Sequence, residues 1–337
     1  MFVSYAQNFE DVILNRLFAD RETGTYVDVG ASHPVIDSVT HAFYERGWSG
    51  LNIEPLPERI AELDYARPRD RNLRIAVAEA AGTATFHAFP KWHGLSTLDP
   101  EVAAAMRRWG DEAHPVEVTI RTLSEVLAEE KVGAIDFLKI DVEGAEGRVL
   151  AGLDLTRWRP VVILIEATYP TTSEPSHHGW EPALLACGYR FVLFDGLNRF
   201  YLREESSEFA GRFSLPPNVF DKYVRWQDAG RPLAHEAHPE HRFARHLADA
   251  WLADIGQVDE AALVRLLGSG IPPHAMEKPI TAESFADLWR RVFGEDVPAG
   301  AAEAVAANDP RPTVAATLKG LVASERFRRK RSRLAGW

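Results

Sequence analysis

Apolar residues follow two different spacings over roughly the first 220 residues. Short runs rich in β-branched and aromatic residues predict strands, whereas stretches with apolar residues every three or four positions predict helices that face a core. The two kinds of segment alternate along the chain. We predict strands at 24–30, 48–55, 73–77, 83–89, 134–141 and 159–168, and helices at 8–19, 39–47, 57–65, 100–109, 122–130, 143–152 and 179–187.

The predicted strand at 159–168, RPVVILIEAT, is apolar through most of its length. Strands without polar alternation, separated by helices, are typical of a mostly parallel sheet that is covered on both faces. The runs YRFVLFDG and RFYLREE follow, joined by an LN link in a turn that contains Gly196 and Asn198, and they predict an antiparallel hairpin. We therefore predict an α/β fold for residues 1–210, with a mostly parallel sheet that ends in this hairpin.

The composition changes after SLPPNVFDKYV. Beyond residue 240 the chain shows only short helical patterns, broken by SGIPPH, DVPAG and NDPRP. We predict a first domain at 1–230 and a small α-helical accessory domain at 240–337, with helical patterns at 242–255, 258–267, 281–293 and 313–327.

The C-terminal run ERFRRKRSRLAGW is basic and ends in Trp337. Basic residues beside an aromatic ring suit a weak contact with an anionic membrane surface. The interpretation that we favour is simpler: the cations stabilise the end of a helix through its dipole. No pattern in the chain indicates an oligomeric state.

The composition limits the cellular compartments and the binding partners that we expect for this protein. The 337 residues include 49 acidic and 38 basic side chains, and the net charge of −11 repels phosphates, so we expect no nucleic-acid partner. The single cysteine, Cys187, excludes an intrachain disulfide and fits a cytoplasmic location. Glu10 and Asp11 stand where a signal peptide would be apolar, and no apolar run is long enough for a transmembrane segment.

Acidic residues stand near the ends of the first two predicted strands. In YVDVGASHP, Asp28 can accept hydrogen bonds and Gly30 permits a close approach of the backbone. In LNIEP, Glu54 lies where a doubly wound fold holds ribose hydroxyls. Each acid alone would also serve as a helix cap. Together, without a phosphate loop, they suit a cofactor that has a ribose and a positive charge, as S-adenosylmethionine does.

A series of motifs resembles a known family. The segments SYAQNFEDVIL, YVDVGASHP, GWSGLNIEP, IAVAEAAGTATF, GLSTL, FLKIDVEGAE and ILIEAT, in this order, resemble the FkbM family of S-adenosylmethionine-dependent O-methyltransferases. With FDGLNRFYL they are most similar to the bacterial branch associated with saccharide and cell-surface glycan gene clusters. The resemblance covers about residues 1–220 and implies a class I methyltransferase fold, which is Rossmann-like with a seven-stranded sheet.

The resemblance also implies a set of cofactor-binding residues. Asp28, Gly30 and Ala31 would lie at the methionine end, Glu54 at the ribose, Ala76 and Val77 at the adenine, and Asp141 at the methyl-bearing end. Ser32 stands where the family usually has asparagine, so it offers one hydroxyl in place of an amide.

Methyl transfer to an alcohol also needs a group that accepts the hydroxyl proton. His33 follows the first strand, and His178 lies in the loop beyond the strand that ends near Glu166. Histidine titrates in the useful range, so we hypothesise that His33 or His178 is the base. We expect the carboxylates of Glu143 and Glu166 to lie near the reacting atoms.

The stretch FLKIDVEGAE at 137–146 concentrates charge at the end of a strand. Asp141, with Glu143 and Glu166, could hold a divalent metal such as Mg²⁺, which would acidify the acceptor. Alternatively, Asp141 and Glu143 could be favourable charges at a helix N-terminus. We interpret Lys139 as the structural partner of one of these carboxylates, because a buried lysine needs a pair.

The function predicted from these features is O-methylation of a saccharide hydroxyl, in a nucleotide sugar, an oligosaccharide or a cell-surface glycan precursor. Three alternatives remain open. The first keeps the chemistry but changes the acceptor to a polyketide or other secondary metabolite. The second, an NAD-dependent oxidoreductase, is disfavoured because the chain lacks GxGxxG. The third is a non-catalytic module that retains the fold.

Overall fold

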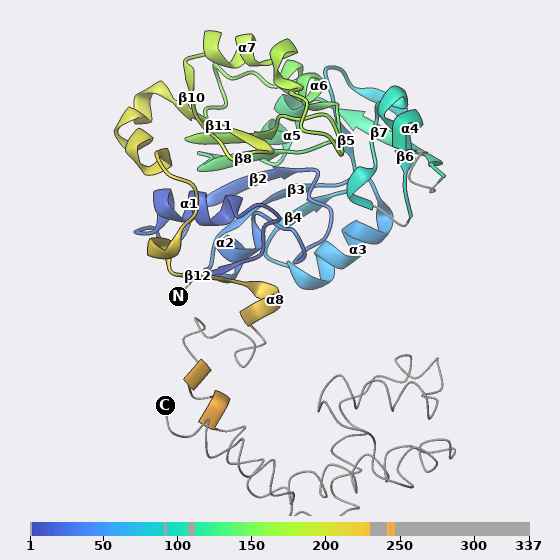
Figure 1. Ribbon diagram of the computed structural model, residues 1–337. Helices are drawn as coiled ribbons and strands as arrows, with labels where there is room; N and C mark the ends of the chain where they lie inside the picture. The colour runs from blue at the N-terminus through green and yellow to red at the C-terminus, as the bar shows by residue number, and fades with distance from the viewer. Residues whose placement is uncertain (1, 91–92, 107–111, 230–240, 243, 247–337) are drawn as a thin grey trace, which may run out of the picture. The chain divides into compact units, whose positions relative to one another are not determined.

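A computed structural model describes residues 2–90, 93–106, 112–229, 241–242 and 244–246. The chain divides into two units, Met1–Gly230 and Arg231–Trp337. Only the first is described at length here (Figure 1). The helical patterns predicted between 240 and 337, and the basic run before Trp337, lie almost wholly outside the described residues and stay predictions.

Seven strands form one sheet in the middle of the first unit (Figure 1). They are β2 (Thr25–Val29), β3 (Ser49–Ile53), β4 (Arg71–Leu73), β8 (Phe137–Ile140), β9 (Val162–Glu166), β10 (Tyr189–Phe194) and β11 (Asn198–Arg203). Their order is β10-β11-β9-β8-β2-β3-β4. Neighbours from β9 to β4 are parallel, and β11 is antiparallel to both β9 and β10. The predicted α/β fold, with a mostly parallel sheet and an antiparallel hairpin, is confirmed.

Helices cover both faces of this sheet (Figure 1). They are α1 (Glu10–Phe18) and α2 (His41–Glu45) on one face, and α5 (Leu123–Glu129), α6 (Glu146–Ala151) and α7 (Glu181–Ala186) on the other. Successive residues of β8 alternate between the two cores, with Phe137 packed on the α1 side and Leu138 and Ile140 on the α5 side. Because strand side chains alternate, Lys139 emerges on the α1 side.

Several short elements differ from the sequence prediction. The strand predicted at 73–77 is divided, because β4 belongs to the large sheet whereas Ala76 and Val77 form a strand of a second sheet. That sheet has the order β5-β7-β6. The sequence analysis predicts no strand at 114–121, although HPVEVTIR forms one. The elements concerned are β5 (Ala76–Val77), β6 (Gly82–Ala88) and β7 (His114–Arg121).

The remaining elements connect or flank the sheets. The chain ends of the first unit meet in a parallel pair, β1 with β12, which the sequence analysis did not predict. The elements are β1 (Phe2–Ser4), α3 (Pro57–Ala66), η1 (His93–Leu95), α4 (Pro100–Met106), η3 (His177–Gly179), η4 (Glu204–Phe213), η5 (Val219–Asp221), β12 (Tyr223–Arg225) and α8 (Trp226–Ala229).

The hairpin turn is longer than the predicted LN link. Strand β10 ends at Phe194 and β11 begins at Asn198. Asp195 closes the turn, since its Oδ1 accepts the N–H groups of Leu197 and Asn198 at 2.9 and 2.6 Å. An Asp side chain that caps its own turn therefore replaces the two-residue link, and Asn198 becomes the first residue of β11.

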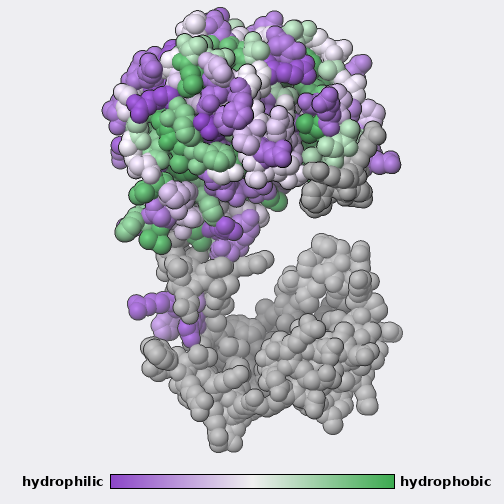
Figure 2. Space-filling model, turned by 45° about the horizontal axis from the view of Figure 1, so that its top comes forward, coloured by the Kyte–Doolittle hydropathy of each residue, from purple (hydrophilic) through white to green (hydrophobic). Residues whose placement is uncertain are grey.

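The surface of the first unit mixes polar and apolar side chains, as Figure 2 shows for one face. Two of the most exposed large apolar side chains, Val219 and Phe220, are 84% and 87% accessible in η5. Among the described residues no helix combines the length and apolar character that a membrane span requires.

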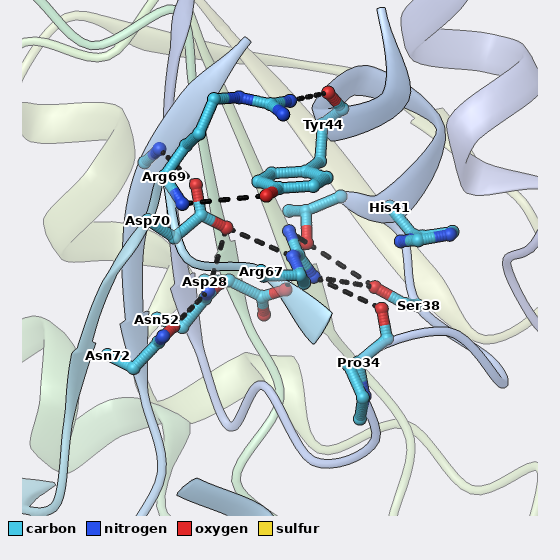
Figure 3. Close-up of polar contacts among 12 residues, drawn as sticks. Asp28, Pro34, Ser38, His41, Tyr44, Asn52, Arg67, Arg69, Asp70 and Asn72 are labelled. Carbon is cyan, nitrogen blue, oxygen red and sulfur yellow. Dashed lines mark hydrogen bonds and ion pairs between the residues drawn. The ribbon is translucent and has the colours of Figure 1, made fainter. Parts of the chain in front are cut away.

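A buried arginine connects three segments of the chain beside β2 (Figure 3). Arg67 follows α3 and is fully buried. Its Nε donates to Asp70 at 3.0 Å, its Nη2 donates to the hydroxyls of Tyr26 and Thr40 at 2.8 and 2.7 Å, and its Nη1 donates to Ser38 at 3.2 Å. The guanidinium therefore ties the end of α3 to β2 and to the segment before α2.

The residues that contact Arg67 also form hydrogen bonds with neighbouring strands. Asp70 also accepts the N–H of Gly50 and the side-chain amide of Asn52, both at 2.9 Å. Thr40, which accepts from Arg67, donates its own hydrogen to Asp28 Oδ2 at 2.9 Å. One buried cation thus helps to orient the Asp28 carboxylate through a single hydroxyl.

We predict that Arg67→Met lowers the free energy of unfolding by about 3–5 kcal/mol, because it leaves Asp70 as a buried charge without its cation. Arg71→Met is the matched control. Arg71 also pairs with a carboxylate, Glu130, but its side chain is 70% exposed, so we expect little change. Urea denaturation followed by circular dichroism measures both. Equal losses in the two variants would contradict this account of the network.

Candidate functional site

A pocket of about 690 Å³ opens at the carboxyl ends of β2, β3 and β8. The chain runs outward from β2 to β4 and then returns to the other side of β2 with β8. Open α/β sheets bind ligands at such a switch point. The sequence-predicted residues that line the pocket are Asp28, Gly30, Ala31, Ser32, His33, Glu54, Ala76, Val77, Asp141 and Glu143.

Gly30 permits the turn that brings two strand ends together. Its N–H donates to the carbonyl of Ile53 at 3.0 Å, and its φ of +79° lies in the left-handed region. A Cβ atom at this position would lie 1.8 Å from the carbonyl oxygen of Asp141. A side chain larger than hydrogen therefore cannot be accommodated without moving the end of β8 away from β2.

Glu54 lies just beyond β3 with 5% of its surface exposed. Its Oε2 accepts the N–H of Ser32 and its Oε1 accepts the N–H of Leu56, both at 3.0 Å. Burial raises the pKa of Glu54 to about 7, although these two N–H groups oppose the shift. Each carboxyl oxygen keeps a second acceptor position for a ligand.

Lys139 is the cation at the centre of the strand ends. Its Nζ donates to the carbonyl of Gly30 at 2.7 Å and lies 3.3 Å from both Asp28 Oδ1 and Asp141 Oδ2. Burial alone would lower the pKa of Lys139, but the carboxylates of Asp141 and Asp28 outweigh it and the pKa is raised. The predicted structural pairing of Lys139 with Asp141 is confirmed.

Three carboxyl groups converge beside the pocket. Asp141, Glu143 and Glu166 each place an oxygen within 4.8 Å of the others. Burial raises the pKa of Glu166, and the charges of Asp141 and Glu143 raise it further. Burial likewise raises the pKa of Glu143, with contributions from Asp141 and Glu146. Both shifts have the same origin, the burial of several carboxyl groups beside one another.

The loop after β8 is held in an unusual backbone conformation. Glu143 and Gly144 have φ values of 54° and 96°. Glu146 stabilises this loop, since its Oε1 accepts the N–H groups of Val142 and Gly144 at 3.2 and 3.0 Å. The structure gives Glu146 a positioning role, because it is buried and fixes the backbone that carries Glu143.

The GLSTL segment forms another wall of the pocket. Thr97 Oγ1 donates to the carbonyl of Glu143 at 2.7 Å, so the segment is attached to the loop after β8. Thr97 itself is fully buried. The residues of this segment that line the pocket are Gly94, Leu95, Ser96 and Leu98.

The two histidines proposed as bases lie in different surroundings. His33 lines the pocket, and its Nδ1 accepts the N–H groups of Val35 and Ile36 at 3.0 and 2.8 Å. This arrangement leaves the hydrogen on Nε2. Burial lowers the pKa of His33, more than the nearby Glu62 carboxylate raises it. Neutral His33 thus presents a donor to the pocket.

His178 is exposed in η3 and is absent from the pocket lining. The segment after β9 folds back on itself, because Tyr169 N–H donates to the carbonyl of Glu174 and Ser176 N–H donates to that of Ala167. Thr171, near the tip of this fold, reaches the pocket instead. Glu166 also lies outside the lining, behind Glu143.

Several lining residues were not predicted as site residues. They include Gln7, Ser38, Arg59, Phe86 and Thr171. Their sequence contexts are those of ordinary loops, helices and strands. Only Arg59 could have been predicted as a lining residue from its position, because it lies five residues after Glu54 at the start of a helix.

Comparisons with known proteins agree with this geometry. Residues 28–191 match the family model described as "Methyltransferase FkbM domain". The match begins at Asp28 and includes the strand ends that line the pocket.

Two relatives each match part of the chain. "Methyltransferase sdnD" of Sordaria araneosa is 33% identical over 153 residues, which are 37% of this chain and 59% of that protein. "31-O-demethyl-FK506 methyltransferase FkbM" of Streptomyces tacrolimicus is 29% identical over 180 residues, which are 46% of this chain and 69% of that protein. The chain thus spans about three fifths of the length of sdnD.

We predict that Gly30→Ala destabilises the protein and weakens any ligand binding in the pocket. The left-handed φ alone costs about 1–2 kcal/mol, and the clash with the Asp141 carbonyl adds to it. Gly82→Ala is the control, because Gly82 has no atom within 4 Å of its Cβ position and no positive φ. Urea denaturation compares them. Wild-type stability in Gly30→Ala would show that the strand ends can separate freely.

Proposed function

We propose that the chain transfers a methyl group from S-adenosylmethionine to a hydroxyl oxygen of a small acceptor, and the match of residues 28–191 to the FkbM methyltransferase family model supports this proposal. The observation that carries the proposal is the pocket at the switch point, with Asp28, Glu54 and Asp141 at three neighbouring strand ends. The strand order, with one antiparallel strand, supports assignment to the class I methyltransferase fold.

The donor set of the pocket fits S-adenosylmethionine. Glu54 offers free acceptor positions on both oxygens for the two ribose hydroxyls. Ala76, Val77 and Phe86 form an apolar wall suited to an adenine ring. When bound, the cofactor supplies an electrophilic methyl carbon on a positively charged sulfur, and the carboxylate of Asp141 favours that charge.

A dinucleotide fits this pocket poorly. A pyrophosphate needs backbone N–H groups in a glycine-rich turn or free cations. Among the lining residues, Lys139 is already paired with Asp28 and Asp141, and Arg59 donates to Glu62. The oxidoreductase is therefore the weaker proposal.

For the acceptor we propose first an alcohol of a polyketide or other secondary metabolite. The name of the Streptomyces relative describes methylation of 31-O-demethyl-FK506 by that protein. A saccharide hydroxyl is the second candidate, because Gln7, Ser38 and Ser96 in the lining offer hydrogen bonds to a hydroxyl-rich molecule.

We predict that S-adenosylmethionine binds and that NAD does not. Glu54 binds hydroxyls best as a carboxylate, and with a pKa of about 7 its ionised fraction rises from about one tenth at pH 6 to about nine tenths at pH 8. Affinity should therefore rise up to about tenfold over this range. The stability of the free protein should change with pH in the opposite direction. Protonated Glu54 stabilises the fold, and this contribution to the free energy of unfolding is lost as pH rises through 7.

Calorimetry at pH 6, 7 and 8 measures both affinities. Glu54→Gln should bind more weakly and with little pH dependence, whereas Glu79→Gln, an exposed carboxylate paired with Arg148, should match the wild type. Radiolabelled methyl transfer to a panel of macrolide alcohols and saccharides then identifies the acceptor class. Tighter binding of NAD than of S-adenosylmethionine would refute the proposal.

The His33 ring can be tested separately from its backbone contacts. We predict that His33→Ala lowers kcat, because the N–H groups of Val35 and Ile36 lose their acceptor. His33→Asn should restore most of the activity, since the Asn Oδ1 can accept the same N–H groups. His178→Ala should keep wild-type kcat, because His178 is exposed and outside the lining. If His33→Asn is as slow as His33→Ala, the Nε2–H group of the imidazole is itself needed in the pocket.

A further inference from the structure

Two neighbouring strands bring three carboxyl groups to one point. Asp141 follows β8, Glu143 lies two residues later, and Glu166 ends β9. Because β8 and β9 are parallel with Ile140 opposite Ile165, the residues that follow them, Asp141 and Glu166, lie at the same level of the sheet edge. The resulting cluster has one oxygen of each residue within 4.8 Å of the others.

Two buried oxygens of this cluster lack hydrogen-bond donors. Glu166 is only 8% exposed, and its Oε2 is buried without a hydrogen-bond partner. The Oε2 of Glu143 is buried and unpartnered as well. A buried acceptor that has lost water and gained no donor costs free energy, so native proteins rarely leave one unless water, an ion or a proton occupies the position.

The neighbouring cation does not donate to the unpartnered oxygens of the cluster. Lys139 is the neighbouring cation, and its Nζ contacts Gly30, Asp28 and Asp141 rather than Glu143 or Glu166. Its charge is therefore shared with a carboxylate outside the cluster. The cluster carries more acidic groups than this single ammonium can neutralise.

The dimensions and ligand chemistry suit a hard divalent cation. Oxygen ligands lie about 2.1 Å from Mg²⁺ and about 2.3–2.6 Å from Ca²⁺, so opposite ligands are about 4.2–5.2 Å apart. Oxygens within 4.8 Å of one another can therefore share one ion. All three ligands are carboxylates, without nitrogen or sulfur, which favours Mg²⁺, Mn²⁺ or Ca²⁺.

We propose that Asp141, Glu143 and Glu166 form a binding site for one hard divalent cation at the edge of the pocket. Asp141 and Glu143 line the pocket, so the ion is accessible from it, while Glu166 contributes its ligand oxygen from outside the lining. The inference stands apart from the proposed function, because the site needs neither cofactor nor acceptor.

The test is direct metal binding to the full chain after treatment with a chelator. Free Mn²⁺, followed by electron paramagnetic resonance, should titrate one site per chain, and Mg²⁺ or Ca²⁺ should compete. Glu166→Gln keeps the size and shape of the side chain but removes the carboxylate charge. It should therefore raise Kd for Mn²⁺ at least tenfold. Glu79→Gln, which changes an exposed carboxylate outside the cluster, should bind as the wild type does.

Two further measurements keep the outcome unambiguous. Circular dichroism checks the fold of each variant, and Glu143→Gln provides a second loss of a ligand if Glu166→Gln fails to fold. The proposal is overturned if the wild type shows no saturable Mn²⁺ binding, or if a folded ligand variant binds as the wild type does. Calorimetry with S-adenosylmethionine on the same samples separates this failure from a failure of the proposed function.

Discussion

The ammonium of Lys139 is the charge on which the carboxyl edge of the sheet depends. Asp28 and Lys139 are paired across β2 and β8, and Asp141 follows two residues later. Without the cation, Asp28 and Asp141 would face each other at neighbouring strand ends with little water to separate them. The contact between Nζ and the Gly30 carbonyl also fixes the turn that leaves β2.

A second buried cation helps to hold this arrangement in place through intermediate residues. Arg67 reaches Asp28 through the hydroxyl of Thr40, and it reaches β3 through Asp70. Asp28 therefore has one oxygen oriented by Thr40 and the other beside Lys139. A side chain with both oxygens engaged loses little entropy when a ligand arrives, which is the usual advantage of a preorganised site.

The sequence analysis predicted the position of pocket residues correctly where that position follows from a strand end. Asp28, Glu54 and Asp141 end parallel strands, and such strands deliver their last residues to one edge. It failed where position depends on how a loop folds. His178 follows β9 in sequence but is carried away, because the segment of Thr171 folds back and presents its own tip to the pocket. No local pattern encodes that reversal.

The sequence by itself determined the alternation of strands and helices, the absence of a phosphate loop and the identity of the acids at the strand ends. These are properties of neighbouring residues, which periodicity and residue type report. Only the tertiary structure decided which carboxylates share Lys139, that His33 Nδ1 is occupied by backbone N–H groups, and that Asp141 and Glu143 line the pocket while Glu166 does not. The physical reason is that pairing and burial arise between segments distant along the chain, and a residue's charge state depends on both.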